Sequence, residues 1–412
     1  MSPADWAGIE SADVYKAGRL AGGLRREGDD VVFECAASYL SEPSAPAVSF
    51  TLPKEPGEVR ASAGAVPPFF AGLLPEGARL QALTASARTS MDDQLTLLLA
   101  VGADAVGDVQ VVPQGISPAD PPALFDPARA ATDDFVSVFA RATATDPEQL
   151  DRVALPGVQV KVSAALISTP LGTTSGPAIL KLNPDNYPHL VENEHFFLAM
   201  AGACGLPVPN HRLLRDRAGR SALLVDRFDR VVTAGVPLRR LPQEDACQVL
   251  GRYPAAKYRL TLQQAATGLA GAVGRAGGSR PLALRRILEI GAFSYLVGNG
   301  DLHAKNLSIR QAPTGVWEVT PGYDLLSTQP YTGWQDPMAL PMYGRANRLG
   351  RRWWLDAAVR LQVPERAVAR ALDRIVDKSQ PWPDRVHEIG FDHRTTERLR
   401  DLLTVRRREL SG

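Results

Sequence analysis

One short stretch, Gly298–Asn306 (GNGDLHAKN), constrains the fold of this 412-residue chain more than any other. It unites residue types that are scarce here, since the chain has 6 His, and only 7 of its 46 basic residues are Lys. Apolar residues at helical spacing precede it, and the apolar Leu307-Ser308-Ile309 follows it. The pattern predicts a helix that ends near Gly298, then a polar loop, then a strand.

Within this loop an aspartate stands five positions before an asparagine, which is the spacing of a kinase catalytic loop. In such a loop the aspartate, here Asp301, accepts a hydroxyl proton, and the asparagine, here Asn306, binds Mg²⁺. Asp324 follows in an apolar frame and is the candidate for a second Mg²⁺ ligand. Lys305 either neutralises phosphoryl charge or pairs with Asp301, and His303 either braces the loop or contacts nucleotide. The competing interpretation is a polar loop with a buried capping aspartate.

The phosphate-handling residues are expected upstream, where each signal is weaker. The turn Leu155–Lys161 contains one glycine and one lysine, and taken alone it is typical of a hairpin. Lys181 ends an apolar strand, and Glu194 lies on the next predicted helix. In protein kinases a lysine and a glutamate in this order bind the nucleotide phosphates and orient the lysine, respectively. The alternative for Glu194 is a solvated position on the helix surface. Leu223–Phe228 then predicts the hinge strand that borders adenine.

The length allows two or three domains, and prolines mark one boundary. Short strands are expected over 12–60, helices over 67–102 and a helix over about 190–204, and a flexible Thr/Ser/Gly loop is expected at 169–176. From about 243 the chain is expected to be mostly helical. The predicted units are an N-terminal subdomain, a Pro-rich connection, a kinase N-lobe core with phosphate loop and hinge, and a helical C-lobe, at residues 1–112, 113–132, 133–230 and 231–412.

Composition excludes several classes of protein. The chain is 45% hydrophobic and 22% charged with 46 basic against 45 acidic residues, so it is an ordinary globular protein without a polyanion-binding bias. No apolar run is long enough to span a membrane, and no secretory signal is evident, so we expect a cytoplasmic protein. Cys35, Cys204 and Cys247 are isolated, which predicts reduced, buried thiols. The basic segment Arg345–Arg352 is either a solvated face or a weak DNA-contacting patch.

Motifs spread over most of the chain resemble those of the HipA family of bacterial toxin serine/threonine protein kinases. They are Phe69–Arg79 (FFAGLLPEGAR), Leu98–Val111, Gly157–Lys161, Asn193-Glu194, Arg227–Arg230 (RFDR), Gln243–Gly251, Gly298–Asn306 and Tyr323–Ser327. The resemblance implies an α+β, two-lobed, protein-kinase-like fold with an α/β N-terminal lobe and a mostly α-helical C-terminal lobe. It implies ATP and Mg²⁺ as cofactors, a protein substrate, which is an aminoacyl-tRNA synthetase for the best-known members, and a HipB-like DNA-binding antitoxin as partner.

The resemblance also implies roles for individual residues. By position, Asp301 is the catalytic base with Lys305 beside it, and Asn306 and Asp324 bind Mg²⁺. The implied ATP contacts are Pro156, Gly157, Val158, Gln159, Val160, Lys161, Lys181, Glu194, Asp226, Arg227, Phe228, His303, Asn306 and Tyr323. One position departs from the family, because Ala154 stands where members usually carry an autophosphorylated serine. Either this chain lacks that switch or the alanine is an engineered replacement.

Two other functions fit parts of the pattern. A small-molecule kinase of the same fold would place an enclosed, acidic pocket beside Asp301, whereas a protein kinase needs an open groove. A non-catalytic co-repressor subunit would have lost Asp301, Asn306 or Asp324, and all three are present. The pattern therefore favours a protein serine/threonine kinase that transfers the γ-phosphoryl group of ATP.

Overall fold

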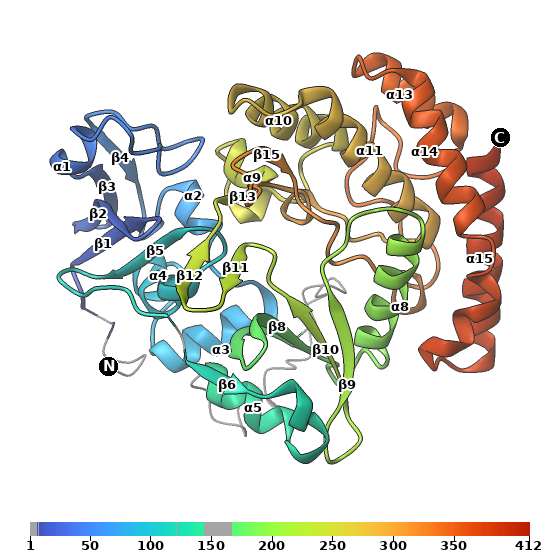
Figure 1. The fold of residues 1–412 in the computed structure, drawn as a ribbon, viewed down its shortest axis with the longest axis horizontal. Coiled ribbons are helices and arrows are strands. Elements are labelled where there is room, and N and C mark those ends of the chain that lie inside the picture. Colours follow the sequence, from blue (N-terminus) through green and yellow to red (C-terminus); the bar gives the residue numbers. More distant parts are fainter. Residues whose placement is uncertain (1–5, 7, 121, 144–166) are drawn as a thin grey trace.

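A computed structural model describes residues 6, 8–120, 122–143 and 167–412 (Figure 1). The predicted phosphate turn Pro156–Lys161 and Ala154 lie outside the described residues. The N-terminal sheet forms one end of the molecule, the last helices form the other end, and a second sheet lies between them (Figure 1).

The N-terminal part is an antiparallel sheet covered by short helices. Its strand order is β4-β3-β2-β1-β5, so the chain returns after its helices to pair β5 with β1. Every second residue of β1 is buried and all of β5 is buried, and the buried side chains of the sheet pack on the helices around Phe33, Phe70 and Leu98. The elements are β1 (Ser11–Lys16), β2 (Arg19–Glu27), β3 (Asp30–Cys35), α1 (Ala37–Leu40), β4 (Glu58–Ala61), α2 (Pro68–Ala71), α3 (Gly77–Ala87), α4 (Gln94–Val101) and β5 (Val109–Pro113).

The second sheet carries the strands that were expected to border a nucleotide. Its order is β6-β7-β8-β10-β9, and β8 lies between β7 and β10. Helix α5 packs on one face through Phe135 and Phe139, and α8 packs against β9 and β10. The elements are β6 (Ala123–Phe125), α5 (Phe135–Thr143), β7 (Ile167–Thr173), β8 (Gly176–Leu182), α8 (Leu190–Ala203), β9 (His211–Arg215) and β10 (Ser221–Asp226). The next two strands, β11 (Arg230–Thr233) and β12 (Val236–Arg240), form a separate two-stranded sheet.

The prediction of a flexible loop at 169–176 is wrong. Residues up to Thr173 belong to β7, which pairs with β8 along its whole length, and the Thr169 and Thr173 side chains are buried. Threonine is β-branched and fits a pleated, half-buried surface, so a Thr-rich segment can be a strand. The turn itself is short, and Gly176 with φ +120° begins β8.

The C-terminal part is mostly helical, as predicted. Helix α11 is buried on nearly all sides and ends at Gly298, which adopts φ +75° as a left-handed C-cap. A small sheet in the order β13-β14-β15 carries the chain back after the Asp301 loop. The elements are β13 (Gln243–Asp245), α9 (Ala246–Val249), α10 (Leu262–Arg275), α11 (Arg280–Val297), β14 (Ser308–Gln311), β15 (Trp317–Val319), α12 (Gln329–Thr332), α13 (Arg351–Arg360), α14 (Glu365–Lys378) and α15 (His393–Ser411).

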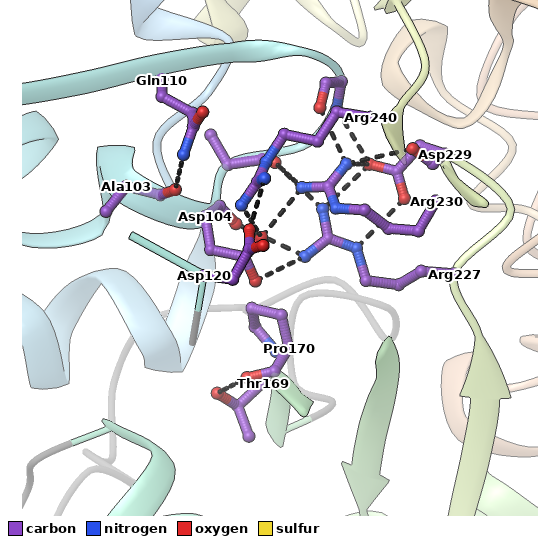
Figure 2. A network of polar contacts seen from close by, with 12 residues as sticks. Ala103, Asp104, Gln110, Asp120, Thr169, Pro170, Arg227, Asp229, Arg230 and Arg240 are labelled. Atoms are coloured by element: carbon purple, nitrogen blue, oxygen red, sulfur yellow. Dashed lines mark hydrogen bonds and ion pairs between the residues drawn. The ribbon is translucent and has the colours of Figure 1, made fainter. Parts of the chain in front are cut away.

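A buried ionic network joins the N-terminal part to the segment that runs from the end of β10 through β12. Figure 2 shows the side chains of Arg227, Arg230 and Arg240 converging on Asp104, and Asp229 completes the network. Arg227 and Arg230 each contact Asp229 within 2.9 Å, and both also donate to the carbonyl of Ala105. Buried charges of this kind are tolerated because each is paired and hydrogen-bonded. The RFDR motif therefore holds two parts of the molecule together.

Two other expectations concern buried and membrane segments. Cys35, Cys204 and Cys247 are free and buried, as predicted. Within the described ranges, none of the helices combines the length and the apolar character that crossing a bilayer requires.

Candidate functional site

Lys181 links three elements at the centre of the candidate site. Its Nζ lies 2.6 Å from Glu194 Oε1 of α8 and also contacts Asp324 Oδ1, which belongs to the segment after β15. Burial alone would lower the pKa of Lys181, but the two carboxylates outweigh it and raise this pKa above its ordinary value. Lys181 therefore stays charged and fixes strand β8, helix α8 and the Asp324 segment relative to one another.

Glu194 and Asp324 differ in their surroundings. Glu194 is 1% exposed, and burial raises its pKa above the ordinary value because this effect outweighs the nearby ammonium. Asp324 is half-buried and adopts φ +52°, a left-handed conformation that is uncommon for a residue other than glycine. Such backbone geometry persists where the surrounding contacts impose it, and it is common at functional sites.

The predicted catalytic loop is ordered by its own hydrogen bonds. Asp301 is 2% exposed, and its carbonyl accepts from Asn306 Nδ2 at 3.1 Å and from the backbone N–H of His303 at 2.8 Å. A single 3-10 turn, Ala304–Asn306, closes the loop before β14. The structure therefore brings Asp301 and Asn306 together, as the five-residue spacing predicts.

Two asparagines hold the Asp324 segment, one from the catalytic loop and one from α8. Asn299 accepts from the backbone N–H of Asp301 at 2.9 Å and donates to the carbonyl of Asp324 at 3.1 Å. Asn193 of α8 donates to the carbonyl of Ser327 at 2.8 Å and accepts from its N–H at 3.0 Å. Both amides are buried, so each replaces backbone pairing that the loops cannot make themselves.

Tyr258 contacts the candidate base directly. Its hydroxyl donates to Asp301 Oδ1 at 2.7 Å, and its ring lies edge-on to the His303 imidazole, with centroids 5.1 Å apart. Burial, and to a lesser degree the Lys257 ammonium, lowers the pKa of His303 to about 4. The imidazole is therefore neutral at physiological pH, which suits a hydrogen-bonding role more than a charge-neutralising one.

The structure gives Lys305 partners that the sequence did not indicate. Its Nζ lies 3.4 Å from Glu76 Oε1, donates to the carbonyl of Gly72 at 3.1 Å, and lies 4.0 Å from Asp245 Oδ2. Glu76 and Gly72 belong to the N-terminal part of the chain, so a segment far away in sequence contacts the catalytic loop.

Of the residues predicted to contact adenine, the described structure brings only some together. Phe228 and Tyr323 come together, with ring centroids 5.8 Å apart, and Asp226 lies at the exposed end of β10. Arg227 does not face this side through its polar groups, because its N–H donates to the carbonyl of Pro177 and its guanidinium belongs to the ionic network of Figure 2. Its expected nucleotide contact would have to come from its backbone carbonyl or from the apolar part of its side chain.

Sequence reasoning assigned no role to Tyr258, Lys257 or Asn299, and none to Glu76 or Asn193. Glu76 and Asn193 stood inside motifs that were quoted only for their resemblance. A signal was available for Lys257, since any lysine is rare in this arginine-rich chain. Tyr258 carried no such signal, because its importance comes from a contact with a residue 43 positions away.

The residues present fit ATP and Mg²⁺. Among the described side chains, Glu194 Oε2 and His303 Nδ1 are buried polar atoms without a hydrogen-bond partner. Asp324 supplies a carboxylate, and Asn306, whose Nδ2 is already used, has its amide oxygen for a cation; both are the hard oxygen donors that Mg²⁺ prefers. No cluster of three or more His, Cys, Asp or Glu side chains suited to a metal occurs in the described part of the chain. Mg²⁺ held by Asp324 and Asn306 would take oxygens of the nucleotide phosphates as further ligands.

Two family models match the chain. The one described as the HipA-like C-terminal domain matches residues 153–382, and the one described as the HipA N-terminal domain matches residues 12–112. The chain belongs to the HipA family. The predicted family resemblance is thereby confirmed.

Individual HipA relatives agree with this result. A Sinorhizobium fredii protein named as a kinase, Y4mE, is 30% identical over 398 residues, which is 93% of each chain. The serine/threonine-protein kinase toxin HipA of Shewanella oneidensis is 30% identical over 302 residues, 66% of this chain and 65% of that one. A chain from the solved complex of Shewanella oneidensis HipA, HipB and operator DNA matches with a TM-score of 0.74 and 21% identity, over 97% of both chains. This match confirms the predicted two-lobed α+β, kinase-like fold.

Proposed function

We propose that this HipA-family chain is an ATP- and Mg²⁺-dependent serine/threonine protein kinase. The observation that carries the proposal is the buried link from Lys181 to both Glu194 and Asp324, with Asp301 tied to Asp324 through Asn299. A strand lysine, a helix glutamate, a loop aspartate and a metal aspartate are the parts that protein kinases use for phosphoryl transfer. Kinase names among the relatives support the same conclusion.

The residues divide the chemistry between positioning and proton transfer. Lys181, oriented by Glu194, would bind phosphate oxygens, and Asp324 and Asn306 would hold Mg²⁺, which would neutralise charge on the phosphates. Asp301 accepts the proton of the serine hydroxyl that receives the phosphoryl group. The serine oxygen bonds to the γ-phosphorus while the bond between the γ-phosphorus and the β,γ-bridging oxygen breaks, so that ADP leaves. Neutral His303 donates or accepts one hydrogen bond at the nucleotide.

The first prediction tests Asp301 as the base. Asp301→Asn keeps the shape and removes the proton acceptor, so phosphoryl transfer should fall by about 10²–10⁴-fold, the usual contribution of general base catalysis. Nucleotide affinity should survive, because it depends on Lys181 and the metal ligands. Incubation with labelled ATP and Mg²⁺ measures transfer, and calorimetric titration with a non-hydrolysable ATP analogue measures binding. Substantial transfer by the variant would remove Asp301 from this role.

The kinase is further proposed to act as the toxin of a toxin–antitoxin pair, by phosphorylating a serine of a cellular protein. The support is family membership and the fold match to a HipA found together with HipB and operator DNA. A HipB-like, DNA-binding antitoxin is the proposed partner. Arg345, Arg348 and Arg352 are exposed and are the candidates for a weak DNA contact in such a complex.

Induced expression in a bacterial host tests the toxin role. Growth should stop with the wild-type chain and continue with Asp301→Asn at equal protein levels, and the phosphorylated host protein can then be identified by mass spectrometry. Equal growth arrest by both proteins would show that arrest does not depend on phosphoryl transfer.

A further inference from the structure

The motif Phe69–Arg79 has no role in the proposed function, yet it lies against the catalytic loop. Helix α2 packs against α9, and Gln248 of α9 donates through Nε2 to the carbonyl of Phe69 at 2.9 Å. A Cβ at Gly72 would meet the Gln248 side chain at 2.6 Å, so glycine allows this close approach. The carbonyl of Gly72 then reaches Lys305. The N-terminal domain therefore contacts the site through two backbone carbonyls, those of Phe69 and Gly72.

Glu76, three residues before the end of this motif, contacts two lysines on opposite sides of Asp301 in the chain. Its Oε2 lies 2.6 Å from Lys257 Nζ and its Oε1 lies 3.4 Å from Lys305 Nζ. The two lysine side chains are largely buried, and Glu76 is half-buried. One carboxylate therefore bridges two ammonium groups that would otherwise repel each other in a region of low dielectric constant.

The charge of Glu76 is secured by these contacts. Burial alone would raise the pKa of Glu76, but Lys305 and Lys257 outweigh it and hold this pKa at about 2. The bridge is therefore ionised over the whole physiological range. Removing one member of a buried ion pair is costly, because it leaves the remaining charges uncompensated.

The bridge is connected to Asp301 by short segments of backbone. Lys257 precedes Tyr258, whose hydroxyl donates to Asp301 Oδ1, and the carbonyl of Lys257 accepts from the N–H of Ala304 at 3.1 Å. Lys305 follows Ala304 directly. A displacement of either lysine would therefore move a segment that touches the carboxylate of Asp301 or the loop behind it.

We propose that Glu76 is a positioning residue of the phosphoryl-transfer site, supplied by the N-terminal domain. It holds Lys305 and the Lys257-Tyr258 segment in place around Asp301, and it makes the kinase dependent on the docked N-terminal domain. This inference rests on the proposed function, because it assigns Glu76 to the same site. Glu76 acts through the lysines, so its loss should affect turnover more than nucleotide binding.

Under the proposed function the full chain should hydrolyse ATP slowly without an acceptor, which gives an assay that needs no protein substrate. Glu76→Gln should lower kcat by about 10–100-fold, since small misplacements of reacting groups cost this much, and should change KM for ATP by less than about threefold. Glu76→Asp keeps the charge but is one methylene shorter, so it should recover part of the activity. Glu58→Gln removes an exposed carboxylate from β4 of the same domain and should behave as wild type.

Thermal unfolding separates positioning from folding. If Glu76→Gln is too unstable to purify, Glu76→Asp carries the test, because it retains a charge opposite both lysines. A full kcat in a folded Glu76 variant, or a higher KM with unchanged kcat, would overturn the positioning role while Asp301→Asn remains inactive. Equal hydrolysis by wild type and Asp301→Asn would instead overturn the proposed function, and the role of Glu76 with it.

Discussion

Asp324 and Asn306 are the two side chains proposed to hold the metal, and they differ in charge. A carboxylate attracts a hard cation through a full charge, whereas an amide offers only a dipole. Asp324→Asn should therefore raise the Mg²⁺ concentration for half-maximal activity more than Asn306→Ala does, and by at least about tenfold, because loss of a ligand's second-shell partner alone costs about 10–100-fold. Activity across a Mg²⁺ titration measures this.

Asn347→Ala, at an exposed position, is the matched control for that experiment. It should leave the Mg²⁺ dependence unchanged. Unchanged dependence in both site variants would place the metal elsewhere. The order of the two effects is also informative, because a larger effect at Asn306 would mean that Asp324 serves mainly as a counterion to Lys181.

Tyr258 offers a second test at the scale of single residues. Its hydroxyl donates to Asp301 Oδ1, and a hydrogen bond to a charged group contributes about 1.5–3 kcal/mol. Tyr258→Phe should therefore lower kcat by roughly tenfold or more, with KM for ATP little changed. Tyr253→Phe, on the same loop but exposed, should have no effect. A rise in KM alone would mean that Tyr258 serves nucleotide binding.

Among the structural elements, helix α8 connects two parts of the site, because two adjacent residues on it contact different segments. Glu194 orients Lys181, and Asn193 brackets both backbone groups of Ser327, three residues after Asp324. Asn193→Ala would leave these buried backbone groups unpaired, at about 1–3 kcal/mol each. It should therefore raise the Mg²⁺ requirement although it touches no metal ligand.

A Mg²⁺ titration of Asn193→Ala, compared with Glu192→Gln from the first turn of α8, tests this coupling. Glu192 contacts Asn183 rather than the Asp324 segment, so its variant should titrate as wild type. If both variants titrate alike, α8 contributes through Glu194 alone.

Elements with a strong local signal could be predicted from the sequence. Helix α11 was predicted with its end at Gly298, because apolar spacing and a C-cap glycine are local properties. Strand β7 was missed, because a Thr-rich segment between Pro and Gly also has the composition of a loop. The partners of Lys305 and Asp301 were missed for another reason, since Glu76 and Tyr258 reach them only through tertiary packing.

At the scale of the whole molecule, the N-terminal domain meets the rest of the chain through ionisable side chains. The ionic network of Figure 2 is one contact, the Glu76 bridge is a second, and Glu244 of β13 is a third. Glu244 Oε1 accepts from the N–H of Phe50 at 2.9 Å, while Oε2 is buried without a hydrogen-bond partner among the described residues. When Glu244 is ionised, its buried Oε2 carries charge without a hydrogen bond. The stability of the folded chain should therefore depend on the protonation of Glu244, and so on pH.

Burial raises the pKa of Glu244 to about 8, far above its ordinary value of 4.5. The folded chain thus keeps this proton up to about pH 8, whereas the unfolded chain loses it near pH 4.5, so Glu244 makes stability fall as pH rises between these values. Glu244→Gln is always neutral and still accepts from Phe50. It should unfold at a higher temperature than wild type at pH 8.5, by an amount that corresponds to roughly 3–5 kcal/mol, and the difference should nearly vanish at pH 4.5. Thermal unfolding of both proteins across this range measures it, with Glu58→Gln as the exposed control. A difference that is the same at both pH values would mean that Glu244 does not hold its proton in the folded protein.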